Sequence, residues 1–337
     1  MKNKKALSIV LLGLLSMLFA EIFSGASQLW FINPFGVLYT LPLYMIHTVF
    51  FLSLAIKYKK KSIRQLYWFG VLFGLYEAVI TKVLWQGYMN ETGPALGRIL
   101  GVAGIEFPIL VFFWHPIFSF ILPILTYQIL SGHVMNDHIK ILTVNKKKNI
   151  IGIMMLIAIS TFILSGNQLN LLSALGALGG TLGLIILIMI FLKGEPIRIE
   201  SFGELKITWI IIWLVAIYLF GGIYLMPERF PGEVIGYITV GVFYLITILL
   251  LKTSINVTVE ELKNVSIYQK KHLMISIGIL TSFILIMPWI WMIGNVILVV
   301  SYFGFTFLGV VFWIGSIYTD IINRRRINKE TILSNNQ

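Results

Sequence analysis

QLYWFGVLFGLYEAVITKVLW, residues 65–85, is the stretch that decides how this chain folds. It is long enough to cross a bilayer as one helix, yet it carries Glu77 and Lys82. A charge at the centre of a membrane-spanning helix costs roughly 2.5–3.5 kcal/mol on insertion scales. Such residues are kept where they face protein or water, so the stretch predicts a polar functional site inside a membrane protein.

A helical wheel divides the stretch into two faces. Glu77 shares its face with small and polar residues, namely Gly70, Gly74, Ala78, Thr81 and Trp85, with Lys82 at the edge. The opposite face suits lipid and holds Phe69, Leu72, Tyr76, Val79, Ile80 and Val83. The two glycines form a GxxxG pair, so we expect a neighbouring helix to pack closely beside Glu77.

A purely structural ion pair between Glu77 and Lys82 is the alternative to a functional site. The two residues are five positions apart, outside the three- or four-residue spacing that brings side chains together on a helix.

Composition indicates an all-α, polytopic transmembrane helix bundle. The 337 residues are 58% hydrophobic and 12% charged, and the mean hydropathy is +0.90. The absence of cysteine excludes disulfides, thiolate metal sites and cysteine nucleophiles. Apolar runs predict ten spanning helices. The first lies within 1–28, and the others are about 36–56, 65–85, 107–131, 149–166, 170–192, 207–226, 233–251, 272–293 and 295–319.

The charge distribution predicts the orientation. The net charge is +12, but the basic residues lie in short loops between apolar runs, as the positive-inside rule requires, and no nucleic-acid motif is present. Of the 26 Lys and Arg residues, Arg98 and Arg229 fall in outer segments and Lys82 within a helix; all others fall on the predicted cytoplasmic side. We therefore expect a cell-membrane protein with both termini cytoplasmic.

The N-terminal run permits two interpretations. Ser24 and Ala26 resemble the cleavage site of a signal peptide. We favour an uncleaved first helix, because the apolar run continues past the usual length of a signal peptide and carries Glu21.

Ionisable residues predicted inside spans cluster in the first four helices, residues 1–131 of a single transmembrane domain; residues 132–337 read as an apolar scaffold. The cluster consists of Glu21, His47, Glu77, Lys82 and His115, with Glu106 nearby. We predict a polar cavity in the outer half of this bundle, lined by Glu21, Glu77 and His115. Substrate-binding candidates are these three with Lys82 and Glu106.

Several other patterns are read as structural. His47 fits a hydrogen-bonded core residue, with a functional role as the alternative, while His133 and His138 read as solvated loop residues. The glycines between Gly176 and Gly183 lie in an apolar run and follow no strand, so they indicate helix packing and not a phosphate-binding loop. No metal or cofactor is predicted.

Three strings carry a resemblance to known proteins: AEIFSG (20–25), GLYEAVITKVLW (74–85) and FFWHPIFSFILPIL (112–125). They resemble an uncharacterised family of prokaryotic multi-pass membrane proteins, mainly over residues 15–130. Glu77 and His115 also resemble the first Glu and first His of the CAAX-type intramembrane proteases. Where those proteases have a second Glu, an Arg and a Phe, this chain has Ala78, Lys82 and Val111.

Three functions fit these patterns. The first is transport of a small solute or ion, with a buried carboxylate binding a proton or cation. The second is an intramembrane hydrolase, with Glu77 as general base and Lys82 or His115 stabilising negative charge. The third is a scaffold without a site. The expected partners are the bilayer and a small solute, lipid or peptide; nucleic acid is excluded, and no oligomeric state is predicted.

The ten-span layout is testable because the chain has no cysteine of its own. Single cysteines in loops 57–64 and 146–148 should resist a membrane-impermeant thiol label in intact cells, whereas the outer loop 86–97 should react. Strong external labelling of either basic loop would contradict the layout.

Overall fold

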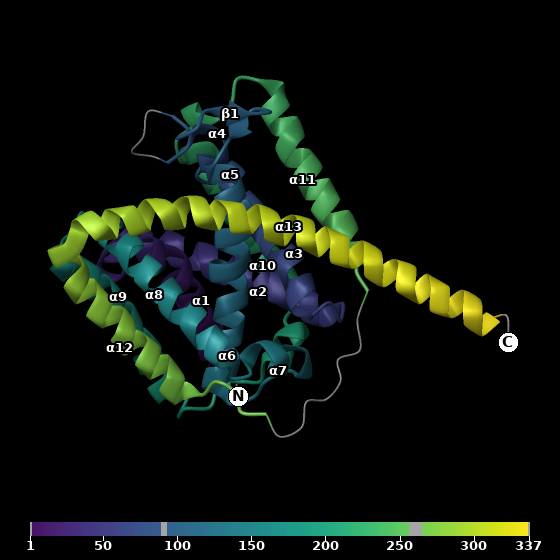
Figure 1. Ribbon diagram of the computed structural model, residues 1–337, viewed down its shortest axis with the longest axis horizontal. Helices are drawn as coiled ribbons and strands as arrows, with labels where there is room; N and C mark the ends of the chain where they lie inside the picture. Colours follow the sequence, from purple (N-terminus) through teal and green to yellow (C-terminus); the bar gives the residue numbers. More distant parts are fainter. Residues whose placement is uncertain (1, 89–92, 256–264, 336–337) are drawn as a thin grey trace.

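The computed structural model describes residues 2–88, 93–255 and 265–335, and it is a helical bundle, as predicted (Figure 1). The strands of the described residues are β1 (Arg98–Ile99) and β2 (Val102–Ala103), which pair antiparallel with Arg98 opposite Ala103. Within the described residues, eight helical segments are long and apolar enough to cross a membrane. The all-α polytopic fold class is thus confirmed.

The N-terminal half contains the elements that build the site. In chain order they are α1 (Lys2–Met17), η1 (Leu18–Ile22), η2 (Trp30–Ile32), η3 (Gly36–Thr40), α2 (Leu41–Lys57), α3 (Ile63–Gly74), η4 (Leu75–Ala78), α4 (Val83–Gln86), α5 (Glu106–Pro108), η5 (Ile109–Ile121) and α6 (Leu122–Ser131). The elements η1, η3 and η5 are π-helical turns, wider than an α-helix, while η2 and η4 are 3₁₀ turns.

The C-terminal half packs around this group. Its elements are α7 (Asn136–Leu142), α8 (Lys146–Gly166), α9 (Leu171–Phe191), η6 (Ile199–Glu204), α10 (Ile207–Tyr224), η7 (Pro227–Arg229), α11 (Val234–Thr253), α12 (Lys270–Ile286), η8 (Met287–Ile290) and α13 (Trp291–Asn335). In Figure 1, α13 crosses the front of the bundle and projects beyond it at the C-terminal end.

Three ranges explain why eight segments stand where ten spans are predicted. The ranges 272–293 and 295–319 belong to one continuous segment, Lys270–Arg325. Figure 1 shows it bending sharply where α12 meets α13, and Pro288 lies in the connecting turn η8, where its missing N–H interrupts the helical ladder. The other range, 65–85, is broken.

The expectation of one continuous helix over 65–85 with a lipid-facing side is wrong. The α-helix ends at Gly74 and η4 at Ala78, and Lys82 has a left-handed backbone with φ of 58°. Phe69, Leu72 and Tyr76 are buried, because α3 is enclosed by α2, α11 and η5. An apolar face suits protein as well as lipid, so the wheel could not tell the two environments apart.

The predicted close approach at the GxxxG pair is present. A Cβ added at Gly70 would overlap the Cα of Pro116, and one at Gly74 would lie 3.0 Å from the Cα of Val111. Thus α3 and η5 pack backbone against backbone, which only residues without a side chain permit.

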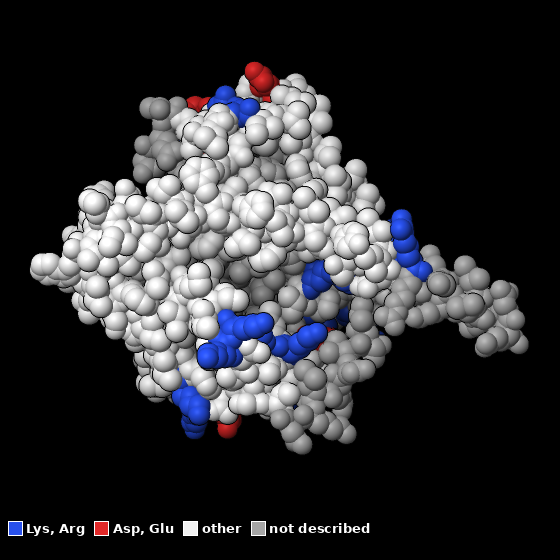
Figure 2. Space-filling view, viewed as in Figure 1, with Lys and Arg blue, Asp and Glu red and all other residues white. Residues whose placement is uncertain are grey.

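Basic side chains gather at one end of the molecule. Figure 2 shows most of the coloured Lys and Arg over the lower part of the view and beside α13 where it leaves the bundle. A separate small group lies at the top near β1, close to acidic side chains. There the guanidinium groups of Arg98 and Arg229 donate to the carbonyl oxygens of Trp85 (3.0 Å) and Gly87 (2.5 Å).

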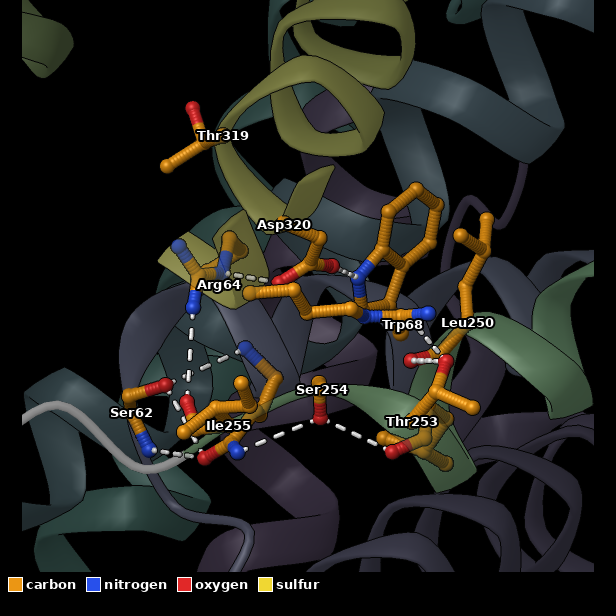
Figure 3. A network of polar contacts seen from close by, with 12 residues as sticks. Ser62, Arg64, Trp68, Leu250, Thr253, Ser254, Ile255, Thr319 and Asp320 are labelled. Atoms are coloured by element: carbon orange, nitrogen blue, oxygen red, sulfur yellow. Dashed lines mark hydrogen bonds and ion pairs between the residues drawn. The ribbon is translucent and has the colours of Figure 1, made fainter. Parts of the chain in front are cut away.

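A buried polar network fixes α13 to the bundle (Figure 3). The Asp320 carboxylate pairs with the Arg64 guanidinium at 2.9 Å and accepts from the Trp68 indole N–H at 2.9 Å. Asp320 is 1% exposed, so its charge depends on these partners. On the same side, Lys60 donates to the Ser254 carbonyl and Arg324 to the Thr253 hydroxyl.

His138 is a buried structural residue, so the interpretation of it as a solvated loop residue is wrong; His133 is exposed, as expected. The His138 Nε2 lies 2.8 Å from the Lys61 carbonyl, and Nδ1 lies 2.7 Å from the Gln128 amide nitrogen. The ring is therefore neutral, with Nε2 donating and Nδ1 accepting. Burial lowers the pKa of this imidazole from its ordinary value.

We predict that Gly70→Ala destabilises the protein by about 1–3 kcal/mol, because backbone atoms of Pro116 occupy the space of the new methyl group. Gly241→Ala is the matched control, since a Cβ there meets nothing within 4 Å. Thermal unfolding in detergent should show a lower Tm for the first variant only. Equal Tm values would show that α3 and η5 do not approach as described.

The His138 contact predicts a pH dependence. Below the ordinary histidine pKa of about 6.5, the unfolded chain binds a proton that the folded state resists. Stability that His138 contributes above this pH is therefore lost as the pH falls toward its lowered folded pKa. Tm measured across this window should fall less in His138→Gln than in the wild type or His133→Gln. Parallel curves for all three proteins would refute the assignment.

Candidate functional site

The centre of the site is a direct contact between Glu77 and His115. The His115 Nε2 lies 3.0 Å from Glu77 Oε1, and the two residues are 1% and 7% exposed. On the other side of the ring, Nδ1 lies 2.8 Å from the Ser119 hydroxyl, and the second Glu77 oxygen accepts from the Thr81 hydroxyl. Every polar atom of the pair therefore has a partner, which a buried pair requires.

Local sequence places these two side chains together. Glu77 sits in the 3₁₀ turn that ends α3, where the chain leaves the helix. His115 precedes Pro116 within the π-helical element η5. A Cβ added at Gly74 would lie 3.2 Å from the Cβ of His115. Because Gly74 has no side chain, the imidazole can approach Glu77 one turn further along. Proline cannot donate a backbone hydrogen bond, and π-helical turns occur often at functional sites.

A second carboxylate, Glu21, lies on the same cavity. It accepts from the Tyr44 hydroxyl and, at 2.6 Å, from the Ser27 hydroxyl. The Tyr76 hydroxyl in turn donates to that of Tyr44 at 3.0 Å. The tyrosines thus form a hydrogen-bonded row beside Glu21, and Tyr76 is the immediate neighbour of Glu77 in the chain.

A cavity of about 1550 Å³ brings the acids together. Glu21, Glu77 and His115 all line it, which confirms the prediction that they share one cavity. The segment between α1 and α2 forms much of its wall, and α13 closes another side. Among the described residues that line it, none is Lys or Arg.

Lys82 and Glu106 lie elsewhere, and neither lines this cavity. The Lys82 Nζ donates to the carbonyl of Gly221 at 2.6 Å and to that of Leu225, where α10 ends, and lies 4.8 Å from the Phe230 ring centre. Glu106 accepts from the Ala95 N–H at 2.8 Å. The left-handed turn at Lys82 directs its side chain to α10, which a continuous helix would not have done.

His47 is a buried, hydrogen-bonded residue, as its sequence pattern indicates. Its Nδ1 lies 2.7 Å from the Leu43 carbonyl, and its ring packs on Phe73 and Tyr76. Among the described residues, no three His, Asp or Glu side chains converge to hold a metal ion.

Tyr44, Tyr76 and Asp320 are buried polar residues that the sequence does not single out. Tyr76 was assigned to lipid because its neighbours on the wheel are apolar. Tyr44 lies three residues before His47, so the two share a face of α2, and this spacing is the sequence signal that could have identified Tyr44. Asp320 was placed in the tail after the last predicted span.

Fold and site together define a multi-pass membrane protein with a polar cavity among its N-terminal helices, and such a protein lies in a lipid bilayer. The chain belongs to a family described as an uncharacterized membrane protein family, whose model matches residues 10–329. An uncharacterized protein of Archaeoglobus fulgidus is 40% identical over 125 residues, covering 36% of this chain and 37% of the relative. The match thus spans little more than a third of that relative. No solved structure matches the chain.

We predict that Lys82→Met destabilises the protein without removing a side chain that lines the cavity. The change leaves the carbonyls of Gly221 and Leu225 without their donor, at a cost of about 1–3 kcal/mol. Thermal unfolding should show a lowered Tm, while ligand or substrate affinity of the folded fraction stays at the wild-type value. An altered affinity at unchanged Tm would place Lys82 in the site after all.

Proposed function

We propose that the chain is an intramembrane hydrolase in which Glu77 and His115 act as one acid–base pair. The observation that carries the proposal is their 3.0 Å contact on the wall of a cavity large enough for substrate. A carboxylate in contact with an imidazole can accept a proton from water and return one to a leaving group.

The proposed reaction uses only these side chains and one water. Glu77 accepts a proton from the water, whose oxygen adds to the substrate's carbonyl carbon. The bond to the leaving group then breaks, and His115, which starts as an imidazolium paired with the Glu77 carboxylate, supplies the proton that the leaving group takes. Ser119 holds the ring from behind, because its hydroxyl lies 2.8 Å from Nδ1. The proton held by Glu77 then returns to His115 across their contact.

Other candidates take different roles in this proposal. Glu21, which accepts from the Tyr44 hydroxyl, binds a second polar part of the substrate, beside the Tyr44–Tyr76 row that leads to Glu77. Lys82 and Glu106, proposed from sequence as substrate-binding residues, have no place in the reaction, because neither lines the cavity and each is hydrogen-bonded to main-chain groups behind its wall. His115 alone is left to balance developing negative charge.

Transport of a small solute or ion is the second candidate. It is favoured by the broken helix, since transporters often place their binding residues where a spanning helix is interrupted, and Glu77 lies at such a break. Against it, the pair sits on two elements packed backbone to backbone at Gly70 and Gly74. Alternating access requires parts that move past each other, whereas this packing holds the pair in one geometry.

We further propose a cell-membrane location with both termini cytoplasmic. Polar contacts join segments predicted to share the cytoplasmic side: Lys4 with Glu195, Lys61 with Asp137 and Arg64 with Asp320. Arg98 and Arg229, the two outer arginines, contact the outer loop instead. This grouping supports the positive-inside orientation.

We predict that Glu77→Gln lowers turnover by about 10²–10⁴, as expected from the loss of a general base. The assay reconstitutes the protein in liposomes with a panel of lipid esters and lipidated peptides in ¹⁸O-labelled water, and mass spectrometry detects label in the products. Glu106→Gln is the matched control, because Glu106 is equally buried but lies outside the cavity.

Labelled product from the wild type and Glu106→Gln, but not from Glu77→Gln, is the expected result. Equal labelling by all three proteins would refute the role of Glu77. Absence of hydrolysis, together with solute uptake that fails in Glu77→Gln, would replace the hydrolase with the transporter.

A further inference from the structure

The cavity that Glu77 and His115 face is larger than a small polar substrate needs. Its volume is about 1550 Å³, against roughly 300–1,000 Å³ for pockets that hold drug-sized ligands. Much of its lining is apolar and aromatic, including Trp30, Leu110, Trp114 and Phe162. The lining also carries polar groups, with Tyr44 and His115 hydrogen-bonded to the two carboxylates, so the cavity presents both polar and apolar surface.

The wall formed by α13 connects the cavity with the bilayer. Val299 and Phe303 line the cavity, yet they are 48% and 50% exposed on a helix long and apolar enough to span the membrane. Ile32, in η2, also lines the cavity and is 70% exposed. On the α13 side the wall is made of side chains from a candidate membrane span, so a hydrocarbon chain can enter from the bilayer without crossing water.

Charge selects among amphiphiles. Of the Asp, Glu, His, Lys and Arg residues, the described lining holds only Glu21, Glu77 and His115, so a phosphate or carboxylate would meet no cation other than a protonated His115. An ammonium group would find both carboxylates already engaged, Glu77 by His115 and Glu21 by Tyr44 and Ser27. A hydroxyl or ester group can exchange hydrogen bonds with these residues without such a cost.

We infer that the cavity binds a neutral amphiphile, with its polar group at Glu77 and His115 and its hydrocarbon chain along the wall completed by α13. This inference rests on the proposed function for its role as substrate, but the binding itself does not require hydrolysis. The amphiphile comes from the bilayer and not from solution, because α13 side chains that line the cavity are also exposed on a candidate membrane span.

Binding is tested with a long-chain fatty alcohol that carries a diazirine in its chain, photo-crosslinked to the full-length protein in nanodiscs. Mass spectrometry should find the label on segments that line the cavity, in residues 20–44 and 298–303. Unlabelled alcohol should compete at least tenfold better than the matched alkyl phosphate, alkylammonium or a short-chain alcohol.

Two matched variants locate the site. Val299→Trp should reduce labelling about tenfold by filling the cavity rim, whereas Val300→Trp should not, because Val300 is exposed on the same helix but does not line the cavity. Thermal unfolding checks that both variants are folded. If Val299→Trp does not fold, the position of the label on the wild type decides the question.

Equal competition by the phosphate or the ammonium compound would overturn the neutral specificity, and equal competition by the short-chain alcohol would overturn the lipid source. Labelling confined to other surfaces, or equal in the two tryptophan variants, would overturn the site. Hydrolysis and labelling measured together on the wild type and Glu77→Gln separate binding of the amphiphile from the hydrolase. If both proteins are labelled and neither hydrolyses any substrate, the binding inference is supported and the hydrolase is refuted. Hydrolysis that depends on Glu77, without specific labelling of the cavity, would support the hydrolase and refute the binding of a neutral amphiphile.

Discussion

The close approach of α3 to η5 is the constraint on which the site depends. Gly70 and Gly74 let the two backbones meet, and the same contact brings the His115 ring to the end of α3, where Glu77 lies. A side chain at either glycine would separate the helices and leave two polar groups buried without each other. In a membrane such a loss is costly, because no water replaces the missing partner.

Buried polar groups outside the site also need partners, because no water reaches them. Lys82 satisfies the carbonyls at the end of α10, and Asp320 joins α13 to the helix that carries Arg64. These two buried charges therefore each link a C-terminal element to the N-terminal helices. The apolar helices provide length and lipid contact, while a few polar contacts fix their positions relative to the cavity.

Sequence reasoning reached the fold class and the common cavity because these depend on patterns along single helices. Apolar length predicts spans, small residues predict close packing, and Glu21, Glu77 and His115 are each costly to keep in a membrane. It failed where tertiary context decides. The helix break after Ala78 sends Lys82 to α10, and enclosure of α3 buries Tyr76, which apolar neighbours had assigned to lipid. The burial of His138 could not be predicted from its local sequence, because its partners Gln128 and Lys61 lie on other segments.

The central claim is that Glu77 and His115 form one coupled pair, and a double-mutant cycle of unfolding free energy tests it without knowledge of the substrate. Glu77→Gln, His115→Gln and the double variant are compared with the wild type in the same detergent. Residues in contact show interaction energies of about 0.5–3 kcal/mol, so the double variant should lose clearly less stability than the sum of the single changes. Additivity within about 0.3 kcal/mol would contradict the contact on which the site is built.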